Sequence, residues 1–254
     1  MKSALSYQGG KSRLAPQIVK MFPEHTCYVE PFCGACWVLF EKSPSKVEII
    51  NDLDSDLVTF WRVIQNHLPE FRRYYEWAVT SREIFNLEKR KDPTTLTDVQ
   101  RACRYFYLQK LCFGGKVQGR SFGTSAVQPS RLNLMDIDDL LLAIHWRMSK
   151  VTIEHLDAIA CIQKYDRPGT LFYCDPPYFE TAGYNVSFEE ADLIRLRDSL
   201  FAAQGKVVVS LNDHPRVRQI FAGWNFKTAS LKYSIGRSAA SKSKDRAEVI
   251  ITNF

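Results

Sequence analysis

The chain has 254 residues, of which 45% are hydrophobic and 24% are charged. These values are close to average globular usage, so they exclude a collagen-like, a disordered and a disulfide-stapled protein; the length suits one large domain or a domain with an insertion. Lysine and arginine outnumber aspartate and glutamate by 34 to 28, which gives a net charge of +6.

Positive charge is concentrated in two parts of the sequence. Residues 56–149 hold 14 basic and 10 acidic side chains, and residues 230–254 hold 5 basic and 2 acidic ones. Clustered lysine and arginine attract phosphate groups, so both parts are candidates for contact with a polyanion. Solvated helix faces explain the charge equally well.

The apolar and cysteine patterns indicate a cytoplasmic protein without a membrane span. The apolar stretch at 206–211 is far shorter than the roughly 20 residues that cross a bilayer, and the N-terminus lacks the apolar core of a secretion signal. Seven cysteines, an odd number, indicate reduced thiols. Cys33 and Cys36 have ligand-like spacing, but the sequence has no second such pair to complete four ligands, so we expect no metal site. We expect both cysteines to be small buried residues rather than a redox pair.

The first predicted unit is a strand, a turn, a helix and a second strand. Residues 27–32 form a short apolar strand, small residues follow at 33–36, and an apolar run at 37–40 begins a helix. Residues 46–50 alternate as the next strand, directly before Asn51 and Asp52. This pattern predicts a parallel strand pair with a right-handed crossover.

The middle of the chain has a different pattern. Residues 53–150 show helical spacing of aromatic and aliphatic side chains and no convincing buried strand. We therefore divide the chain into a catalytic domain, residues 1–55 and 150–254, and a mostly helical insertion, residues 56–149. Within the insertion, residues 113–123 include four glycines, which is typical of an exposed turn or hairpin that approaches a ligand closely.

Strand patterns return after residue 150, together with a helical pattern over residues 188–203. The predicted strands are 151–153, 169–174, 206–211 and 248–252. Strands that alternate with helices predict an α/β fold in which helices cover both faces of one sheet.

Two features at the predicted strand ends indicate a nucleoside site. The small residues at 34–36 let backbone approach a ligand, and Asp52 is placed to accept hydrogen bonds from two ribose hydroxyls. The three-glycine dinucleotide fingerprint is incomplete, which favours a nucleoside-containing ligand over a dinucleotide. A tight turn and a surface aspartate are the alternative.

The tetrapeptide Asp175-Pro-Pro-Tyr178 directly follows the predicted strand at 169–174. Two prolines cannot continue a central strand or donate backbone hydrogen bonds, so the segment presents only acceptors. A carboxylate beside a proline carbonyl can accept both hydrogens of an exocyclic amine, which withdraws the amine lone pair from the ring, while Tyr178 offers a face for stacking. A strand-ending turn is the alternative.

Four motifs, in this order, resemble the α-group of the Dam (D12) family of adenine-N6 DNA methyltransferases. They are Tyr7-Gln-Gly-Gly-Lys11, Val29-Glu-Pro-Phe-Cys-Gly34, Asn51-Asp52 and Asp175-Pro-Pro-Tyr178. The resemblance covers nearly the whole chain. It implies a Rossmann-like methyltransferase domain that uses S-adenosylmethionine, with an inserted target-recognition domain, encoded by a bacterium or a phage and active on double-stranded DNA.

The resemblance also assigns roles to residues of this chain. Asp175, Pro176, Pro177 and Tyr178 would grip an adenine that has been flipped out of the duplex. The residues that would bind S-adenosylmethionine are Tyr7, Gly10, Lys11, Phe32, Gly34, Asp52, Asp157 and Asp175. Of these, Lys11 would lie near the donor's carboxylate, Asp52 would hold its ribose and Asp157 would reach its adenine amino group.

Some positions depart from the family pattern. Ala35 and Cys36 stand where glycine is frequent, and Ala158 stands where an aromatic residue is common. These departures bear on the affinity for the cofactor rather than on its identity.

For DNA contact the sequence offers Lys116 and Arg120 in the glycine-rich loop and Arg237 in the basic C-terminal part. We expect these side chains to contact phosphates more than bases. The loop lacks the Asn-rich pattern of the members that read GATC. The recognised sequence, a partner restriction enzyme and the oligomeric state therefore stay open, and a monomer is compatible with the chain.

Other functions are compatible with parts of this pattern. An RNA- or protein-directed methyltransferase could use the same Asp-Pro-Pro-Tyr chemistry, although the helical insertion favours DNA. A non-catalytic DNA-binding module is an alternative of a different class, and the intact Asp52, Asp175 and Tyr178 count against it. A nicotinamide oxidoreductase is the weakest alternative because the third glycine of its fingerprint is absent.

Overall fold

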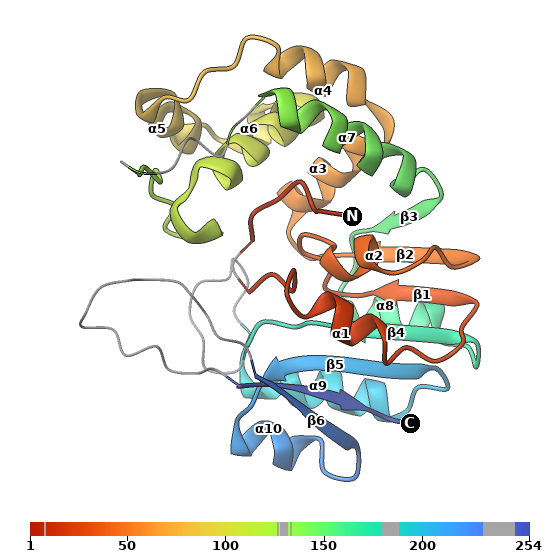
Figure 1. Ribbon diagram of the computed structural model, residues 1–254. Helices are drawn as coiled ribbons and strands as arrows, with labels where there is room; N and C mark the ends of the chain where they lie inside the picture. The colour runs from red at the N-terminus through yellow and green to blue at the C-terminus, as the bar shows by residue number, and fades with distance from the viewer. Residues whose placement is uncertain (8, 126, 128–131, 133, 179–187, 231–246) are drawn as a thin grey trace.

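The computed structural model describes residues 1–254 except 8, 126, 128–131, 133, 179–187 and 231–246 (Figure 1). Within the described part, seven strands form one sheet in the order β3-β2-β1-β4-β5-β7-β6. The strands are β1 Cys27–Glu30, β2 Val47–Asn51, β3 Val151–Glu154, β4 Thr170–Cys174, β5 Lys206–Asn212, β6 Asn225–Ser230 and β7 Ala247–Thr252. The predicted Rossmann-like α/β fold is confirmed.

The sheet is mixed rather than wholly parallel. Strands β3, β2, β1, β4 and β5 run parallel to one another, whereas β7 is antiparallel to both β5 and β6. Strand β6 was not predicted, because its mostly exposed residues give only a weak apolar alternation. Since parallel strands share one carboxyl edge, the residues that follow β1, β2 and β4 meet there.

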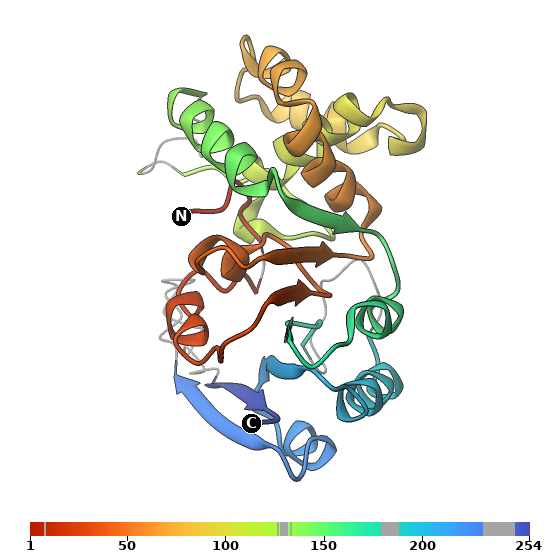
Figure 2. The same ribbon diagram turned by 90° about the vertical axis from the view of Figure 1, so that its right-hand side faces the viewer.

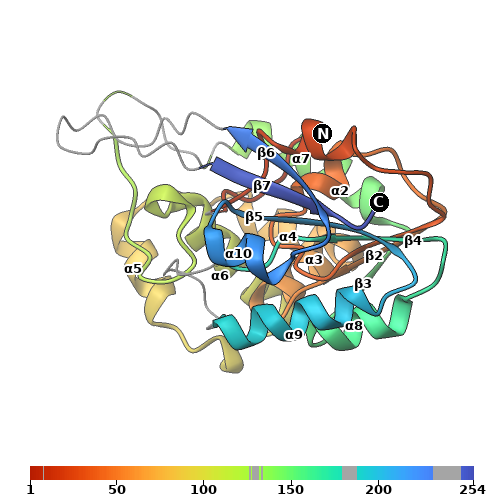
Figure 3. The ribbon, with the colours of Figure 1, turned by 90° about the horizontal axis from the view of Figure 1, so that it is seen from below.

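Helices cover both faces of the sheet (Figure 3). They are α1 Ala15–Val19 and α2 Trp37–Glu41 on one face, and α8 Ala158–Tyr165, α9 Glu190–Phe201 and α10 Pro215–Ile220 on the other. Alternate strand residues serve the two faces: Tyr28 packs with the first group and Val29 with the second. Among the described residues, no helix combines the length and apolar character needed to cross a membrane.

A layer of helices lies beyond the β3 edge of the sheet (Figures 1 and 2). It contains α3 Ser55–Asn66, α4 Leu68–Tyr75, α5 Arg82–Arg90, the short turn η1 Pro93–Thr95, α6 Asp98–Leu111, the short turn η2 Phe113–Gly115 and α7 Leu134–Met148. Phe60, Trp61 and Phe106 join α3 to α6, and Phe60 stacks on Phe106 with ring centroids 5.7 Å apart. These side chains belong to the same core cluster as α1 and α2, so the layer has no separate hydrophobic core of its own within the described residues.

The glycine-rich loop after α6 is exposed at most of its positions, as the sequence predicted. Cys112 and Phe122 form an isolated antiparallel bridge that closes it. Gly115 and Val117 are the buried positions, and the backbone of Gly115 packs against the N-terminal segment.

The shared core yields a stability prediction. Phe60→Ala removes a fully buried ring, and we expect it to lower the free energy of unfolding by about 3–5 kcal/mol in urea titrations. Phe113→Ala removes a ring that is 59% exposed, and its effect should stay within about 0.5 kcal/mol. Equal effects of the two substitutions would contradict this description of the core.

Candidate active site

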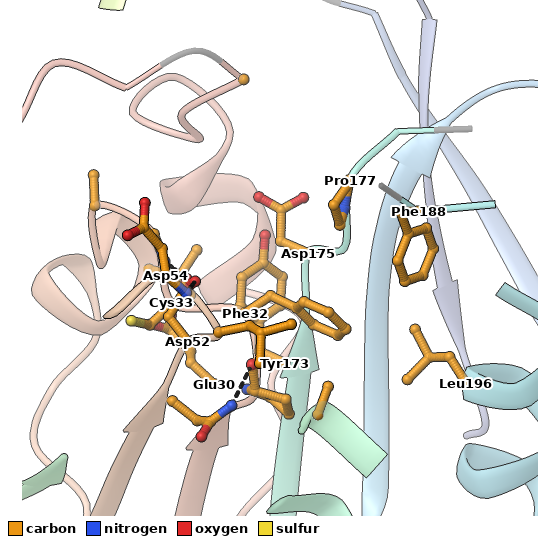
Figure 4. A pocket seen from close by; sticks show the side chains of 18 of the residues that line it. Glu30, Phe32, Cys33, Asp52, Asp54, Tyr173, Asp175, Pro177, Phe188 and Leu196 are labelled. Carbon is orange, nitrogen blue, oxygen red and sulfur yellow. Dashed lines mark hydrogen bonds between the residues drawn. The ribbon is translucent and has the colours of Figure 1, made fainter. Parts of the chain in front are cut away.

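A cavity lies at the carboxyl edge of the sheet, over the ends of β1, β2 and β4. Figure 4 shows Asp52 and Cys33 on one side of it, Asp175 and Pro177 on another, and the ring of Phe32 between them. Segments that are far apart in the sequence thus contribute to one site. The predicted residues Tyr7, Gly10, Lys11, Gly34 and Asp157 line the same cavity.

The turn after β1 has a conformation that depends on glycine and on its neighbours. Gly34 has φ 45°, and Cys36, at φ 55°, is the one described non-glycine residue with a positive φ. The Asp52 carboxylate accepts hydrogen bonds from the backbone N–H groups of Gly34, at 2.9 Å, and Asp54, at 3.0 Å. Trp61 Nε1 donates to the Gly34 carbonyl at 3.0 Å. The turn is therefore held from both β2 and α3.

Asn51 joins the ends of three segments, although the sequence analysis gave it no role of its own. Its Nδ2 donates to the carbonyls of Pro31, at 2.9 Å, and Leu156, at 3.0 Å, and its Oδ1 accepts from the Leu156 N–H at 2.8 Å. The side chain is buried, so these bonds satisfy backbone groups that water does not reach. They fix the spacing between the turns that follow β1, β2 and β3.

The N-terminal segment closes over the turn after β1. A Cβ at Gly34 would lie 3.5 Å from the ring of Tyr7, and the Gly10 N–H donates to the Tyr7 carbonyl at 3.0 Å. A Cβ at Gly10 would lie 2.7 Å from Trp37 Nε1 and 2.9 Å from the Tyr7 oxygen, so this position requires glycine. The N-terminal segment can lie this close to Trp37 only because residue 10 is a glycine.

Lys11 is buried, with 4% of its surface exposed. Its Nζ lies 2.7 Å from Asp175 Oδ1 and 3.7 Å from Glu248 Oε2, and it donates to the Tyr178 hydroxyl at 2.7 Å. It also lies 4.6 Å from the centroid of the Tyr178 ring. Lys11 therefore binds two residues of the Asp-Pro-Pro-Tyr segment at once.

Asp175 is held through one of its two oxygens. Its Oδ1 contacts Lys11 and accepts from the Ser210 hydroxyl at 2.9 Å, and Ser210 in turn lies 2.8 Å from the Tyr173 hydroxyl. Within the described residues no hydrogen bond reaches Oδ2. Burial raises the pKa of the Asp175 carboxyl, Lys11 opposes that rise, and Glu248 adds to it. The free oxygen is thus an oriented acceptor at the cavity.

The other predicted residues occupy different positions around this centre. Pro177 lines the cavity, whereas Pro176 and Tyr178 are buried, so Tyr178 is not an open stacking platform here. Asp157 caps α8 by accepting from the Ile159 N–H at 3.0 Å and is exposed at the cavity rim. The Phe32 ring meets Phe188 edge-on, with ring centroids 6.2 Å apart.

The predicted DNA contacts fall into three groups. Lys116 is exposed on the loop after α6. Arg120 is half-buried: its guanidinium lies 5.1 Å from the ring centroid of Tyr105, and it donates to Gln109 Oε1 at 3.1 Å, so it holds the loop rather than extending from it. Arg237 lies outside the described residues.

Two further acidic groups at the cavity, besides Asp175, have raised pKa values. Burial raises the pKa of the Asp52 carboxyl to about 6, and the backbone N–H groups of Asp54 and Gly34 oppose the rise. Glu30, at the end of β1, was not predicted as a site residue. Its Oε1 accepts from the Tyr28 hydroxyl at 2.6 Å, its Oε2 is buried with no partner in the described part, and burial raises its pKa to about 8.

Comparison with known proteins shows the family to which the chain belongs. The family model for D12 class N6 adenine-specific DNA methyltransferases matches residues 7–235, which is most of the chain. The chain belongs to this family. The enzymes of this family use S-adenosylmethionine to methylate adenine in DNA, as the four sequence motifs had indicated.

Relatives with established names agree with the family. The DNA N-6-adenine-methyltransferase of Escherichia phage P1 is 21% identical over 248 residues, and the alignment covers 91% of this chain and 32% of that protein. Type II methyltransferase M.CviBI of Paramecium bursaria Chlorella virus NC1A is 24% identical, with 92% and 91% covered. The Retron Ec67 DNA adenine methylase of Escherichia coli is 25% identical, with 98% and 90% covered. The chain thus spans about a third of the phage P1 protein and about nine-tenths of the other two.

The residues at the cavity suit S-adenosylmethionine. Gly10 and Gly34 line the cavity without side chains, and Gly34 has the positive φ that favours glycine. Asp52 offers carboxylate oxygens for ribose hydroxyls, and acidic groups suit a ligand that carries a sulfonium and an ammonium charge. Within the described residues, no cluster of three or more His, Cys, Asp or Glu side chains could hold a metal ion.

The buried carboxyl of Glu30 yields a pH prediction. Its folded-state pKa of about 8 lies above the ordinary glutamate value of 4.5, so the folded protein holds a proton that the unfolded chain releases between these values. The associated stability is complete below pH 4.5 and is lost as pH rises through about 8. Glu30→Gln keeps an oxygen that accepts from the Tyr28 hydroxyl and from the Leu39 N–H. As pH rises from 5 to 9, we expect the stability of this variant relative to the parent protein to increase by roughly 2–4 kcal/mol, measured by urea unfolding.

Glu48→Gln is the matched control. Glu48 is also buried, but Arg147 and Lys42 bond its carboxylate and lower its pKa despite its burial. This substitution should destabilise the protein at both pH values. A pH-independent difference between Glu30→Gln and the parent protein would contradict the neutral state of Glu30.

Proposed function

We propose that this enzyme transfers the methyl group of S-adenosylmethionine to N6 of an adenine flipped out of double-stranded DNA. The observation that supports this proposal most directly is Asp175, whose Oδ1 is held by Lys11 and Ser210 while Oδ2 has no hydrogen bond among the described residues. Such an oxygen can accept one hydrogen of an exocyclic amine without rearrangement. The reaction would take place in the cytoplasm of a bacterium or of a phage-infected cell, which contains such DNA.

The donor would bind across the ends of β1 and β2. Asp52 would accept the ribose hydroxyls, Asp157 would accept from the adenine amino group, and Tyr7, Phe32 and Gly34 would enclose the nucleoside. When bound, S-adenosylmethionine supplies an electrophilic methyl group attached to a sulfonium. Lys11 was expected near the donor's carboxylate, but its ion pair with Asp175 supports the role of orienting that residue instead.

The reaction would depend on the positions of two hydrogen-bond acceptors in the Asp-Pro-Pro-Tyr segment. Asp175 Oδ2 and the carbonyl of Pro176 would accept the two amine hydrogens, so that the lone pair leaves conjugation with the purine ring and faces the methyl group. The new N–C bond forms as the S–C bond breaks, and the cationic amine then loses its proton to water. Asp175 need not be a strong base, because positioning and electrostatics contribute most to such a transfer.

The helical layer, residues 56–149, would contact the DNA. Lys116 is exposed on the loop after α6, and the neighbouring Phe113 ring is 59% exposed. A basic group beside an exposed ring suits a phosphate contact next to a base step. Extruding the adenine costs a few kcal/mol, which such contacts and the two amine hydrogen bonds would offset.

Asp175→Ala tests the reaction itself. We expect sequencing that detects N6-methyladenine to find modified sites in cells that express the parent protein, and to find none with the variant. In vitro, methyl transfer should fall at least about 100-fold while binding of S-adenosylhomocysteine changes little. Asp213→Ala, which alters an aspartate after β5 that pairs with Arg218, should retain activity.

The same experiment decides between the alternatives. Unmodified DNA in cells that express the folded parent protein would favour a non-catalytic DNA-binding module. Methylated RNA with unmodified DNA would favour an RNA-directed enzyme. Equal turnover by Asp175→Ala and the parent protein would remove Asp175 from its proposed role.

Lys116→Ala tests the DNA contact. Because each phosphate contact releases counterions, we expect weaker binding to all duplexes and a salt slope reduced by about 1. The control is Lys206→Ala, which removes an exposed lysine at the amino end of β5, on the opposite edge of the sheet. If both variants bind duplex DNA with the parent salt slope, the loop after α6 does not contact phosphates through Lys116.

A further inference from the structure

A buried glutamine connects the loop after α6 with the N-terminal segment of the cofactor cradle. Gln109 lies in α6 and is fully buried. Its Nε2 donates to the carbonyl of Ser6 at 2.6 Å and to the carbonyl of Gly115 at 2.8 Å. Its Oε1 accepts from Arg120 Nη2 at 3.1 Å. One amide therefore bonds to the loop at two points and to the N-terminal segment at a third.

The two segments are also in direct contact. Gly115 has φ 68°, and a Cβ there would lie 3.1 Å from Ser6 backbone atoms and from the Tyr7 nitrogen. This is closer than an added carbon tolerates without a shift of one backbone. The loop and the N-terminal segment consequently cannot move independently while Gln109 holds both.

On its other side, the N-terminal segment forms the site. The Tyr7 ring covers Gly34, and Lys11 binds Asp175 and Tyr178. A displacement of Ser6 and Tyr7 would therefore alter both the cradle for the donor and the orientation of Asp175. The contacts run without a break from exposed Lys116 to the catalytic tetrapeptide.

We infer that Gln109 is a positioning residue that couples DNA binding to donor binding and to methyl transfer. The inference rests on the proposed function, in which the loop carrying Lys116 contacts DNA. When DNA fixes the loop, Gln109 and Gly115 fix Ser6 and Tyr7, so the donor binds to a cradle that is already ordered. Because such coupling is reciprocal, the donor also favours the DNA-competent loop.

Glutamine is the side chain that these contacts require. Two carbonyls need two donors from one buried group, and one arginine needs an acceptor; a primary amide provides all three. Leucine would leave the Ser6 and Gly115 carbonyls without this partner, and each buried unsatisfied group is costly. The segments would then separate or admit water.

The chain offers a matched control in Gln65 of α3. Its Nε2 also donates to two backbone carbonyls, those of Met148 at 2.7 Å and Val151 at 2.8 Å. These bonds join α3 to the start of β3. They involve neither the loop after α6 nor the N-terminal segment. Gln65→Leu therefore removes two side-chain hydrogen bonds to backbone carbonyls, as Gln109→Leu does, but leaves the contact between the loop and the N-terminal segment in place.

The test is a binding cycle on the full chain. The Kd of S-adenosylhomocysteine is measured by calorimetry with and without a duplex that carries the site reported by methylation sequencing. We expect the duplex to tighten binding by the parent protein at least about fivefold, and by Gln109→Leu less than about twofold. Gln65→Leu should keep the parent ratio. Single-turnover methyl transfer should slow for Gln109→Leu at saturating donor and DNA.

Gly115→Ala provides an independent variant should Gln109→Leu fail to fold, which thermal melting reports. Its added carbon presses on Ser6 and Tyr7 and should also lower the coupling ratio. A parent ratio close to one, or a ratio unchanged in the two loop variants, overturns the inference while methylation by the parent protein continues. Absence of methylation by the parent protein overturns the proposed function instead.

Discussion

The structure depends on the buried ion pair between Lys11 and Asp175. A carboxylate removed from water is costly unless a charge and hydrogen bonds compensate it, and here the compensation comes from different segments of the chain. The N-terminal segment supplies Lys11, β5 supplies Ser210, and β7 places Glu248 on the far side of the lysine. The tetrapeptide is therefore oriented only when these segments are assembled.

The sheet makes this assembly possible. Parallel strands end at one edge, so residues after β1, β2 and β4 are neighbours although the helical layer separates β2 from β3 in the sequence. Asn51 then joins the turns with bonds to Pro31 and Leu156. The antiparallel β7 returns Glu248 to the same edge. The proposed donor and acceptor sites are thus built on rigid strand ends rather than on independent loops.

The helical layer is joined to this centre instead of being attached by a linker. Its aromatic residues share a core with α1 and α2, and Trp61 of α3 bonds the turn at Gly34. Arg147 of α7 bonds Glu48 of β2. The layer that we propose contacts DNA and the cavity that we propose as the active site are then parts of one packed body, which gives the proposed coupling through Gln109 a physical path.

The sequence by itself determined the family, the α/β class, and two segments that line or border the cavity, the turn after β1 and Asp-Pro-Pro-Tyr. These features are contiguous motifs and alternating apolar strands, which a local pattern records. Only the tertiary structure decided that Lys11 is buried on Asp175 and that Arg120 faces inward. It also decided that Glu30 lines the cavity and that Gln109 joins the loop after α6 to the N-terminal segment. Burial and pairing join residues that are distant in the chain, and no local pattern records which partner a charged or amide side chain meets.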